Sequence, residues 1–192
     1  MRDYCRIAAQ YCKDVLAGKI PSGRHVKEAC QRQVDDLKRW NKKTSPFVFD
    51  KTKAERVCKF IELLPHIKGP LAGTNIVLEP WQIFILTTTF GWVTQAGYRR
   101  YRRVYIEVPR GNGKSAMSSA LGLYMLCYDN EGGAEVYSFA TTRDQAKIVF
   151  GDAKVMAKKS PGLMKSFGVD VNSHTINVVS TASKFEAQSA EG

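Results

Sequence analysis

Near its middle the chain reads Val108-Pro109-Arg110-Gly111-Asn112-Gly113-Lys114-Ser115. The preceding residues, 103–108, have the composition of a β-strand, and residues 114–128 carry apolar side chains at helical spacing. A glycine-rich loop between a strand and a helix is typical of a phosphate-binding (Walker A) loop. Gly111 and Gly113 would let several backbone N–H groups point inward, where the partial positive charge of the helix N-terminus adds to them.

The side chains of this loop suggest separate tasks. Lys114 would reach the β- and γ-phosphates of a nucleotide, and the Ser115 hydroxyl would bind Mg²⁺. Arg110 would stabilise charge on the γ-phosphate; a solvated loop arginine is the alternative. Val108 stands where the pattern GxxxxGK[ST] has its first glycine, so a chance surface turn also stays open from the loop alone.

The segments after the loop indicate the fold class. A second strand is predicted at residues 135–140 and a helix at residues 144–158. Residues 160–162, Ser-Pro-Gly, are expected to form a turn, and short strands are expected at residues 175–180 and near Phe185. This order is typical of an α/β protein with a parallel sheet.

The part of the chain before the loop is predicted to be helical. Two helices are expected within residues 1–43, the first ending at Gly18, and a third at residues 52–64, closed by Pro65. A fourth opens at Leu78-Glu79-Pro80-Trp81-Gln82, with the proline in its first turn. We therefore expect a helical region over residues 1–75 and the first part of a nucleotide-binding domain over residues 76–192.

Composition narrows the classes of protein. The 192 residues are 44% hydrophobic and 24% charged, which excludes wholesale disorder. No apolar run is long enough to span a bilayer, so no membrane association is expected. Five cysteines without a CxxC pair and three dispersed histidines argue against a zinc site.

The charge is strongly basic. Residues 1–100 contribute +9 of the net +11, from 18 Lys and Arg against 9 Asp and Glu. A nucleic-acid partner and a merely soluble surface both fit this charge. The run Tyr98-Arg99-Arg100-Tyr101-Arg102-Arg103 likewise fits contacts to nucleic-acid phosphates, or a structural or partner-pairing role.

Together these segments resemble the ATPase domain of tailed-phage terminase large subunits. The resemblance rests on residues 78–82, 103–115 and 137–146 and extends to the leading helices, so it covers essentially the whole chain. Terminases often lack the first loop glycine and carry an arginine in the loop, as Val108 and Arg110 do here. The implied fold is an α/β P-loop NTPase of the RecA/ASCE class, with an incomplete parallel sheet and an N-terminal helical subdomain.

The resemblance also implies site residues. Arg110 and Lys114 would be catalytic, Ser115 would bind the metal, and nucleotide would be bound by Gln82, Arg110, Gly111, Asn112, Gly113, Lys114 and Ser115. Gln82 would read adenine, because a carboxamide both donates and accepts; a helix-terminal glutamine is the alternative. Thr141, Thr142 and Arg143 would lie where the second strand ends, with Arg143 facing nucleotide, DNA, a neighbouring subunit or solvent.

The implied activity is that of a DNA-packaging motor in the host cytoplasm, docked transiently on the procapsid. ATP and Mg²⁺ would be its cofactors, and ATP hydrolysis would move double-stranded DNA into the capsid. Its partners would be the portal protein, the small terminase subunit and further copies of the chain in a ring. A different P-loop ATPase such as a helicase, and an inactive remnant that only binds DNA or a partner, are the alternatives.

One departure from the family pattern concerns catalysis. Such ATPases need an Asp-Glu pair at the end of an apolar strand, for Mg²⁺ and for activating water. No four apolar residues followed by Asp-Glu occur after Lys114. We therefore expect the N-terminal part of a longer protein, with the nuclease domain absent, phosphate binding retained and hydrolysis in doubt.

Overall fold

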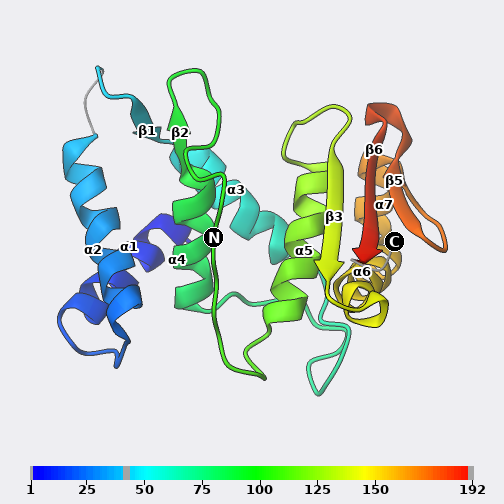
Figure 1. Cartoon of the computed structure of the whole chain (residues 1–192), viewed down its shortest axis with the longest axis horizontal. Helices are drawn as coiled ribbons and strands as arrows, with labels where there is room; N and C mark the ends of the chain where they lie inside the picture. Colours follow the sequence, from blue (N-terminus) through cyan, green and yellow to red (C-terminus); the bar gives the residue numbers. More distant parts are fainter. Residues whose placement is uncertain (1, 41–43, 190–192) are drawn as a thin grey trace. The chain divides into compact units, whose positions relative to one another are not determined.

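The computed structural model describes residues 2–40 and 44–189. The chain divides into two compact units, Met1–Lys59 with Val77–Ile106, and Phe60–Ile76 with Glu107–Gly192. The expected division at residue 75 therefore differs from the division into compact units, and it stays a prediction about domains. Figure 1 follows the chain from α1 to β6.

The first unit is mainly helical, as its sequence predicts. Three helices, α1, α2 and α4, pack with α1 against both of the others. Asp3 caps α1, since its carboxylate accepts from the Arg6 N–H at 2.8 Å, and Gly18, with φ +74°, follows the helix end. The elements of this unit are α1 (Tyr4–Leu16), α2 (Arg24–Arg39), β1 (Phe47–Phe49), α4 (Pro80–Gly91) and β2 (Trp92–Thr94).

Trp92 lies at the centre of this unit's core. Its side chain is 1% exposed, and its indole N–H donates to Gln33 Oε1 at 2.7 Å, so the one polar atom of the ring is satisfied. The ring of Phe49 packs edge-on against it at 5.3 Å. The short antiparallel pair β1–β2, which places Phe49 opposite Trp92, was not predicted.

The helix α3 (Lys51–Ile61) begins in the first unit and ends in the second. The second unit holds the α/β part of the chain. The predicted helices around residues 114–128 and 144–158 are confirmed as α5 and α6, and the strand at residues 135–140 is confirmed as β3. Its elements are α5 (Lys114–Cys127), β3 (Glu135–Ala140), α6 (Arg143–Lys158), α7 (Pro161–Phe167), β4 (Val169–Val171), β5 (Thr175–Val178), the 3-10 turn η1 (Val179–Thr181) and β6 (Ser183–Ser189).

The sheet of the second unit has the order β3-β6-β5-β4 and is mixed. Only β3 and β6 are parallel; β5 is antiparallel to both β6 and β4. The expectation of a wholly parallel sheet is wrong here because the connections are too short. Residues 172–174 join β4 to β5 and the 3-10 turn joins β5 to β6, whereas a parallel connection needs a crossover of a dozen or more residues.

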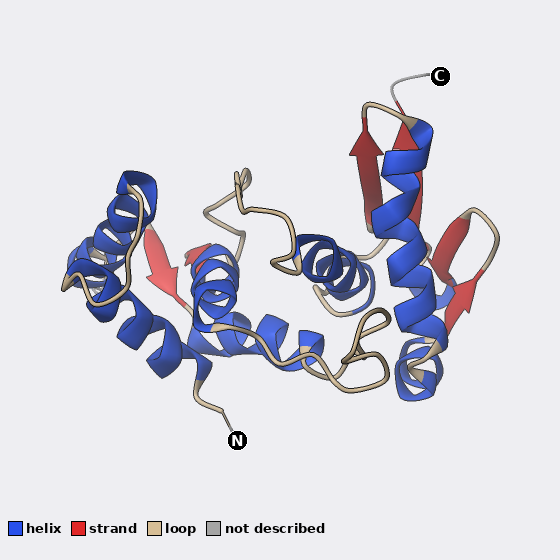
Figure 2. Ribbon diagram, turned by 90° about the horizontal axis from the view of Figure 1, so that it is seen from below, coloured by secondary structure: helices blue, strands red, loops and turns tan. Residues whose placement is uncertain are grey.

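Phe185 of β6 holds the helices onto this sheet. It is 1% exposed, and its ring meets Phe150 of α6 edge-on at 5.6 Å. A Cβ at Gly122 of α5 would lie 2.6 Å from the same ring, so α5 approaches as closely as a glycine permits. In Figure 2 both helices lie beside the strands, and α5 and α6 also pack against each other.

Two local predictions after residue 100 are wrong. Residues 103–108 form no strand, and within this segment the side chains of Val104 and Tyr105 are 50% and 87% exposed. A strand exists only through hydrogen bonds to a neighbour, and none of the strands that the structure describes pairs with this segment. The expected turn at residues 160–162 is instead the start of α7, where Pro161 occupies the first helical turn and its missing N–H costs nothing. Among the described helices, none is long and apolar enough to cross a membrane.

Candidate functional site

The predicted phosphate-binding loop has the backbone that its glycines permit. Gly111 and Gly113 have φ of +85° and +69°, left-handed backbone values that a residue with a Cβ adopts only at a cost in free energy. Gly113 is the residue that precedes α5, so the chain turns sharply and enters the helix within one residue. The loop therefore presents backbone rather than side chains at the start of α5.

The first turn of α5 has no side-chain cap. Met117 donates the first helical hydrogen bond, to the Gly113 carbonyl at 2.9 Å. The N–H groups of Lys114, Ser115 and Ala116 come before that bond and point out of the helix end. With the helix macrodipole, three such donors form a site suited to an anion.

Asn112 braces the loop from within. Its side-chain amide donates to the carbonyl of Pro109 at 3.2 Å and to that of Arg110 at 3.4 Å. These two bonds link the Asn112 side chain to the backbone of residues 109 and 110 and so stabilise the turn of the loop. The structure thus gives Asn112 a part in shaping the loop, and its contact with nucleotide stays a prediction.

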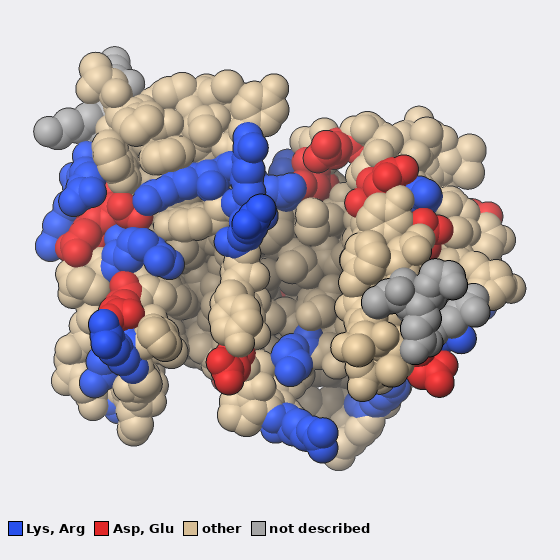
Figure 3. Space-filling view, in the orientation of Figure 1, with Lys and Arg blue, Asp and Glu red and all other residues tan. Residues whose placement is uncertain are grey.

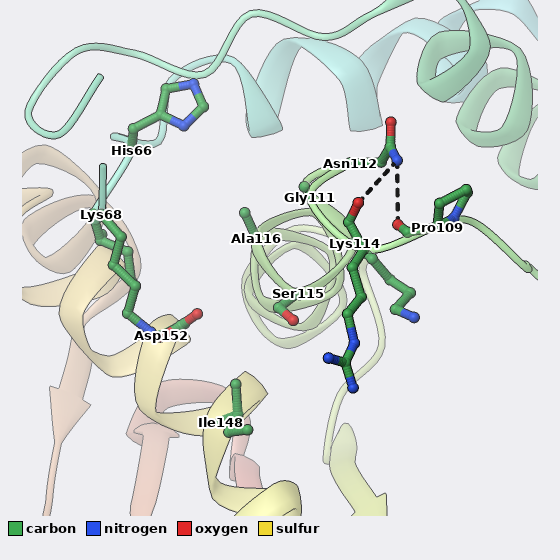
Figure 4. A pocket seen from close by; sticks show the side chains of 13 residues that line it. His66, Lys68, Pro109, Gly111, Asn112, Lys114, Ser115, Ala116, Ile148 and Asp152 are labelled. Atoms are coloured by element: carbon green, nitrogen blue, oxygen red, sulfur yellow. Dashed lines mark hydrogen bonds and ion pairs between the residues drawn. The ribbon is translucent and has the colours of Figure 1, made fainter. Parts of the chain in front are cut away.

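The loop forms one side of a cavity of about 370 Å³, within the size range of small-molecule sites. Its walls are residues 109–116, residues 66–68 from the segment before α4, and Ile148 and Asp152 from α6. All of these residues belong to the second unit. Figure 4 shows His66 and Lys68 across the cavity from the glycine loop, with Asp152 and Ile148 along α6.

Charge in the cavity is mostly positive. Lys114, Arg110 and Lys68 line it, while Asp152 supplies the carboxylate. Lys68 Nζ lies 2.6 Å from Asp152 Oδ1, and the Asp152 side chain is only 12% exposed. No cluster of three metal-ligating His, Cys, Asp or Glu side chains occurs in the described part of the chain. Ser115, the predicted metal ligand, lines this cavity.

A family model described as the ATPase domain of the terminase large subunit matches residues 80–192, which are 113 of the 192 residues. The chain belongs to this family. Among solved structures, it is similar to the large terminase of bacteriophage HK97, with a TM-score of 0.61 and 25% sequence identity. That match covers 73% of this chain and 28% of the HK97 chain, so this terminase spans much less than the length of that relative. No curated protein sequence matches the chain.

Gln82, the expected adenine-reading residue, lies in the first unit at the start of α4. Its carboxamide oxygen accepts from the Glu79 N–H at 2.9 Å, and the Glu79 side chain accepts from the Gln82 N–H, forming a capping box. The terminase chain thus uses the oxygen of Gln82 locally, and the capping box makes no use of its NH₂ group. A role in adenine recognition stays a prediction.

Residues after β3 are placed as expected, at the carboxyl end of that strand. Thr142 caps α6 by accepting from the Gln145 N–H at 3.4 Å, and Thr141 is exposed. The Arg143 side chain lies outside what the structure describes. For Thr142, the observed contact is therefore structural.

The arginine cluster at residues 98–103 divides into separate roles. Arg100 donates to Asp36 Oδ2 at 2.8 Å, with the two side chains 18% and 7% exposed, and it packs against the Phe47 ring at 4.7 Å. This contact supports the structural alternative for Arg100, whereas Arg102 and Arg103 are exposed. Figure 3 shows basic side chains gathered over α2 and the segment after β2, interspersed with acidic ones.

Sequence reasoning missed the wall of the cavity that faces the loop. His66, Lys68 and Asp152 lie far from Lys114 in sequence, and none belongs to a nucleotide-binding motif. One signal was present: Gly69 and Gly73 interrupt a segment bounded by Pro65, and long loops of this kind are often functional. Nothing in the α6 sequence marks Asp152 as different from its other charged residues.

Proposed function

We propose that this chain is the ATP-binding part of a DNA-packaging motor, in which ATP hydrolysis drives double-stranded DNA into a capsid. The observation that carries the proposal is the uncapped start of α5, preceded by two left-handed glycines and opening into a cavity. Membership of the terminase ATPase family supports the same function, since an ATPase domain implies nucleotide binding.

The residues of the loop fit a nucleotide with Mg²⁺. The amides of residues 114–116 and the Lys114 ammonium would bind the phosphates, and the Ser115 hydroxyl would hold the metal. Arg110 would stabilise the negative charge that grows on the transferred phosphoryl group, and Gln82 would recognise adenine. Mg²⁺ would neutralise phosphate charge when bound. Residues 114–192 contain no apolar run followed by Asp-Glu. We therefore propose that this stretch binds nucleotide, and we do not assign ATP hydrolysis to it.

Membership of the family also supports a proposal about the wider assembly. We propose double-stranded DNA, a portal protein, a small terminase subunit and a ring of identical chains as partners, with action in the host cytoplasm during transient docking on the procapsid. The excess of Lys and Arg in residues 1–100 suits a partner with a phosphate backbone.

The experiment is calorimetric titration of the chain with Mg²⁺ and a non-hydrolysable ATP analogue, alongside Lys114→Ala. Lys114 is exposed, so its removal should leave folding intact while it lowers affinity at least about a hundredfold, consistent with losing charge-assisted bonds to phosphate. Lys165→Ala, also exposed and outside the cavity, is the matched control and should bind as the unaltered chain does. Equal binding by Lys114→Ala and the control would refute the proposal.

A further inference from the structure

The segment between α3 and α4, residues 62–79, is held together by its own backbone hydrogen bonds. His66 donates its N–H to the Thr74 carbonyl at 2.8 Å and accepts from the Gly73 N–H at the same distance. Ile76 donates to Leu64, and Pro65 forms a bridge with Asn75, which closes the base of the loop. The backbone of His66 is thereby fixed at the edge of the cavity.

One side-chain contact ties this loop to α6. Lys68 Nζ lies 2.6 Å from Asp152 Oδ1, the separation of a strong charge-assisted hydrogen bond. The helix of Asp152 packs against α5, where the Ser119 hydroxyl lies 2.8 Å from both the Val149 and the Ser115 carbonyl oxygens. The contact joins residues 84 apart in sequence across one wall of the cavity.

Burial decides how this contact behaves when a phosphate arrives. The Lys68 side chain is 71% exposed but that of Asp152 only 12%. If Lys68 left for a phosphate, a mostly buried carboxylate would lose its partner, which is strongly unfavourable. A phosphate bound at the glycine loop would have the α5 amides and Lys114 as partners. We therefore expect Lys68 to stay with Asp152 and to hold the loop.

The wall that this contact holds has a different chemistry from the phosphate loop. Ile67 and Ile148 are aliphatic, and His66 contributes an imidazole ring. Aliphatic side chains and the face of an imidazole ring stabilise the apolar faces of a base and ribose. Ile67 and Ile148 have no hydrogen-bond donor for a phosphate, so this part of the wall favours the nucleoside. The cavity thus has a phosphate side at residues 111–115 and, opposite, a side suited to the nucleoside.

We propose that Lys68 and Asp152 are positioning residues that hold the loop containing His66 and Ile67 as the nucleoside-binding wall of the cavity. The inference rests on the proposed function, since it requires that the loop before α5 bind the phosphates. It goes further by naming residues that no nucleotide-binding motif contains and by assigning them to one end of the ligand.

The test compares two probes, a non-hydrolysable ATP analogue and inorganic tripolyphosphate, both with Mg²⁺, in calorimetric titration of the full chain. Lys68→Met and Asp152→Asn should each weaken the ATP analogue about tenfold and leave tripolyphosphate within about twofold. The double variant should bind no more weakly than the weaker single variant, because both changes remove one contact. Lys68→Arg, which keeps a donor for Asp152, should restore binding of the analogue.

Two controls separate this inference from the proposed function. Lys114→Ala should weaken both probes at least about a hundredfold; if it binds both as the unaltered chain does, the proposed function fails and the inference with it. If Lys114→Ala weakens both but Lys68→Met weakens neither probe or both alike, the inference alone is overturned. Circular dichroism melting monitors folding, and the exposed Lys68 gives a variant that should fold even if Asp152→Asn does not.

Discussion

The helices α4 and α5 begin in opposite ways. Glu79 and Gln82 cap α4 reciprocally, and Pro80 fills its first turn. Gly113 precedes α5 with φ +69° and contributes no side chain, so the N–H donors of the first turn have no side-chain cap. A glycine at the N-cap costs only a few tenths of a kcal/mol relative to a capping side chain, so the start of α5 gives up a little stability that α4 keeps. Sites of binding are where such sacrifices are expected.

The helix α6 shows that the difference is local and not a property of the second unit. Thr142 caps it by accepting from the Gln145 N–H, so the start of α6 has the side-chain cap that the start of α5 lacks. Among α4, α5 and α6, only α5 begins without a side-chain cap, and it begins at the glycine loop and the cavity.

Among changes to the two helix caps, the largest effect is expected from Gly113→Ala, which forces a Cβ onto a left-handed residue. The free energy of unfolding should fall by about 1–2 kcal/mol, and affinity for the ATP analogue should fall more than about tenfold as the loop shifts. Gly133, with φ +68° and nothing within 4 Å of an added Cβ, offers the matched control in a turn outside the cavity. Gly133→Ala should cost similar stability, measured by urea unfolding, with binding unchanged; equal loss of binding would contradict this account.

A smaller effect is expected from Glu79→Ala, which removes the cap of α4. Loss of the capping box should lower the free energy of unfolding by about 1 kcal/mol. Tripolyphosphate binding should not change, because its proposed donors lie at the start of α5. Urea unfolding and calorimetry measure the two quantities, and weaker tripolyphosphate binding would show that the two helix ends are not independent.

Gln82→Glu separates the two roles of this residue. A glutamate in the same place still accepts from the Glu79 N–H, so the capping box and the melting temperature should be retained. It lacks the NH₂ donor, so one hydrogen bond to adenine would be lost, about fivefold in affinity, together with the preference for ATP over GTP analogues. Unchanged affinity and preference would leave Gln82 with the capping role alone.

Local pattern was sufficient for most helices and for the glycine loop. Helix α5 follows from Gly113, Lys114 and the apolar residues after them, and Pro80 marks α4, because these signals act within one or two turns. The run at residues 135–140 was equally informative, since its alternation and flanking turns are those of a strand.

The rest depends on partners distant in sequence. Residues 103–108 have strand composition but form no strand, because composition does not supply a neighbour. The contact of Lys68 with Asp152 and the place of His66 in the cavity come from how the 66–76 loop folds against α6, which no spacing predicts. Strand direction in the sheet followed connection length rather than the α/β pattern as a whole.

A pH-dependent effect is expected at the other end of α5, where Cys127 is the last residue. Burial raises the pKa of its thiol from the ordinary value of 9.0 to about 12. Between pH 9 and 12 the thiol is ionised in the unfolded chain but neutral in the folded chain, which favours the unfolded chain. This contribution to stability is therefore complete below pH 9 and is lost as pH rises from 9 toward 12. In Cys127→Ala this contribution is absent, so between pH 8 and 10 its free energy of unfolding should fall less than that of the unaltered chain, by up to about 1.4 kcal/mol. Urea unfolding at the two pH values measures it, and parallel losses in both proteins would mean that Cys127 ionises as readily in the folded chain. Binding of the ATP analogue at pH 8 should be the same in both, since Cys127 lies at the end of α5 away from the glycine loop and outside the cavity.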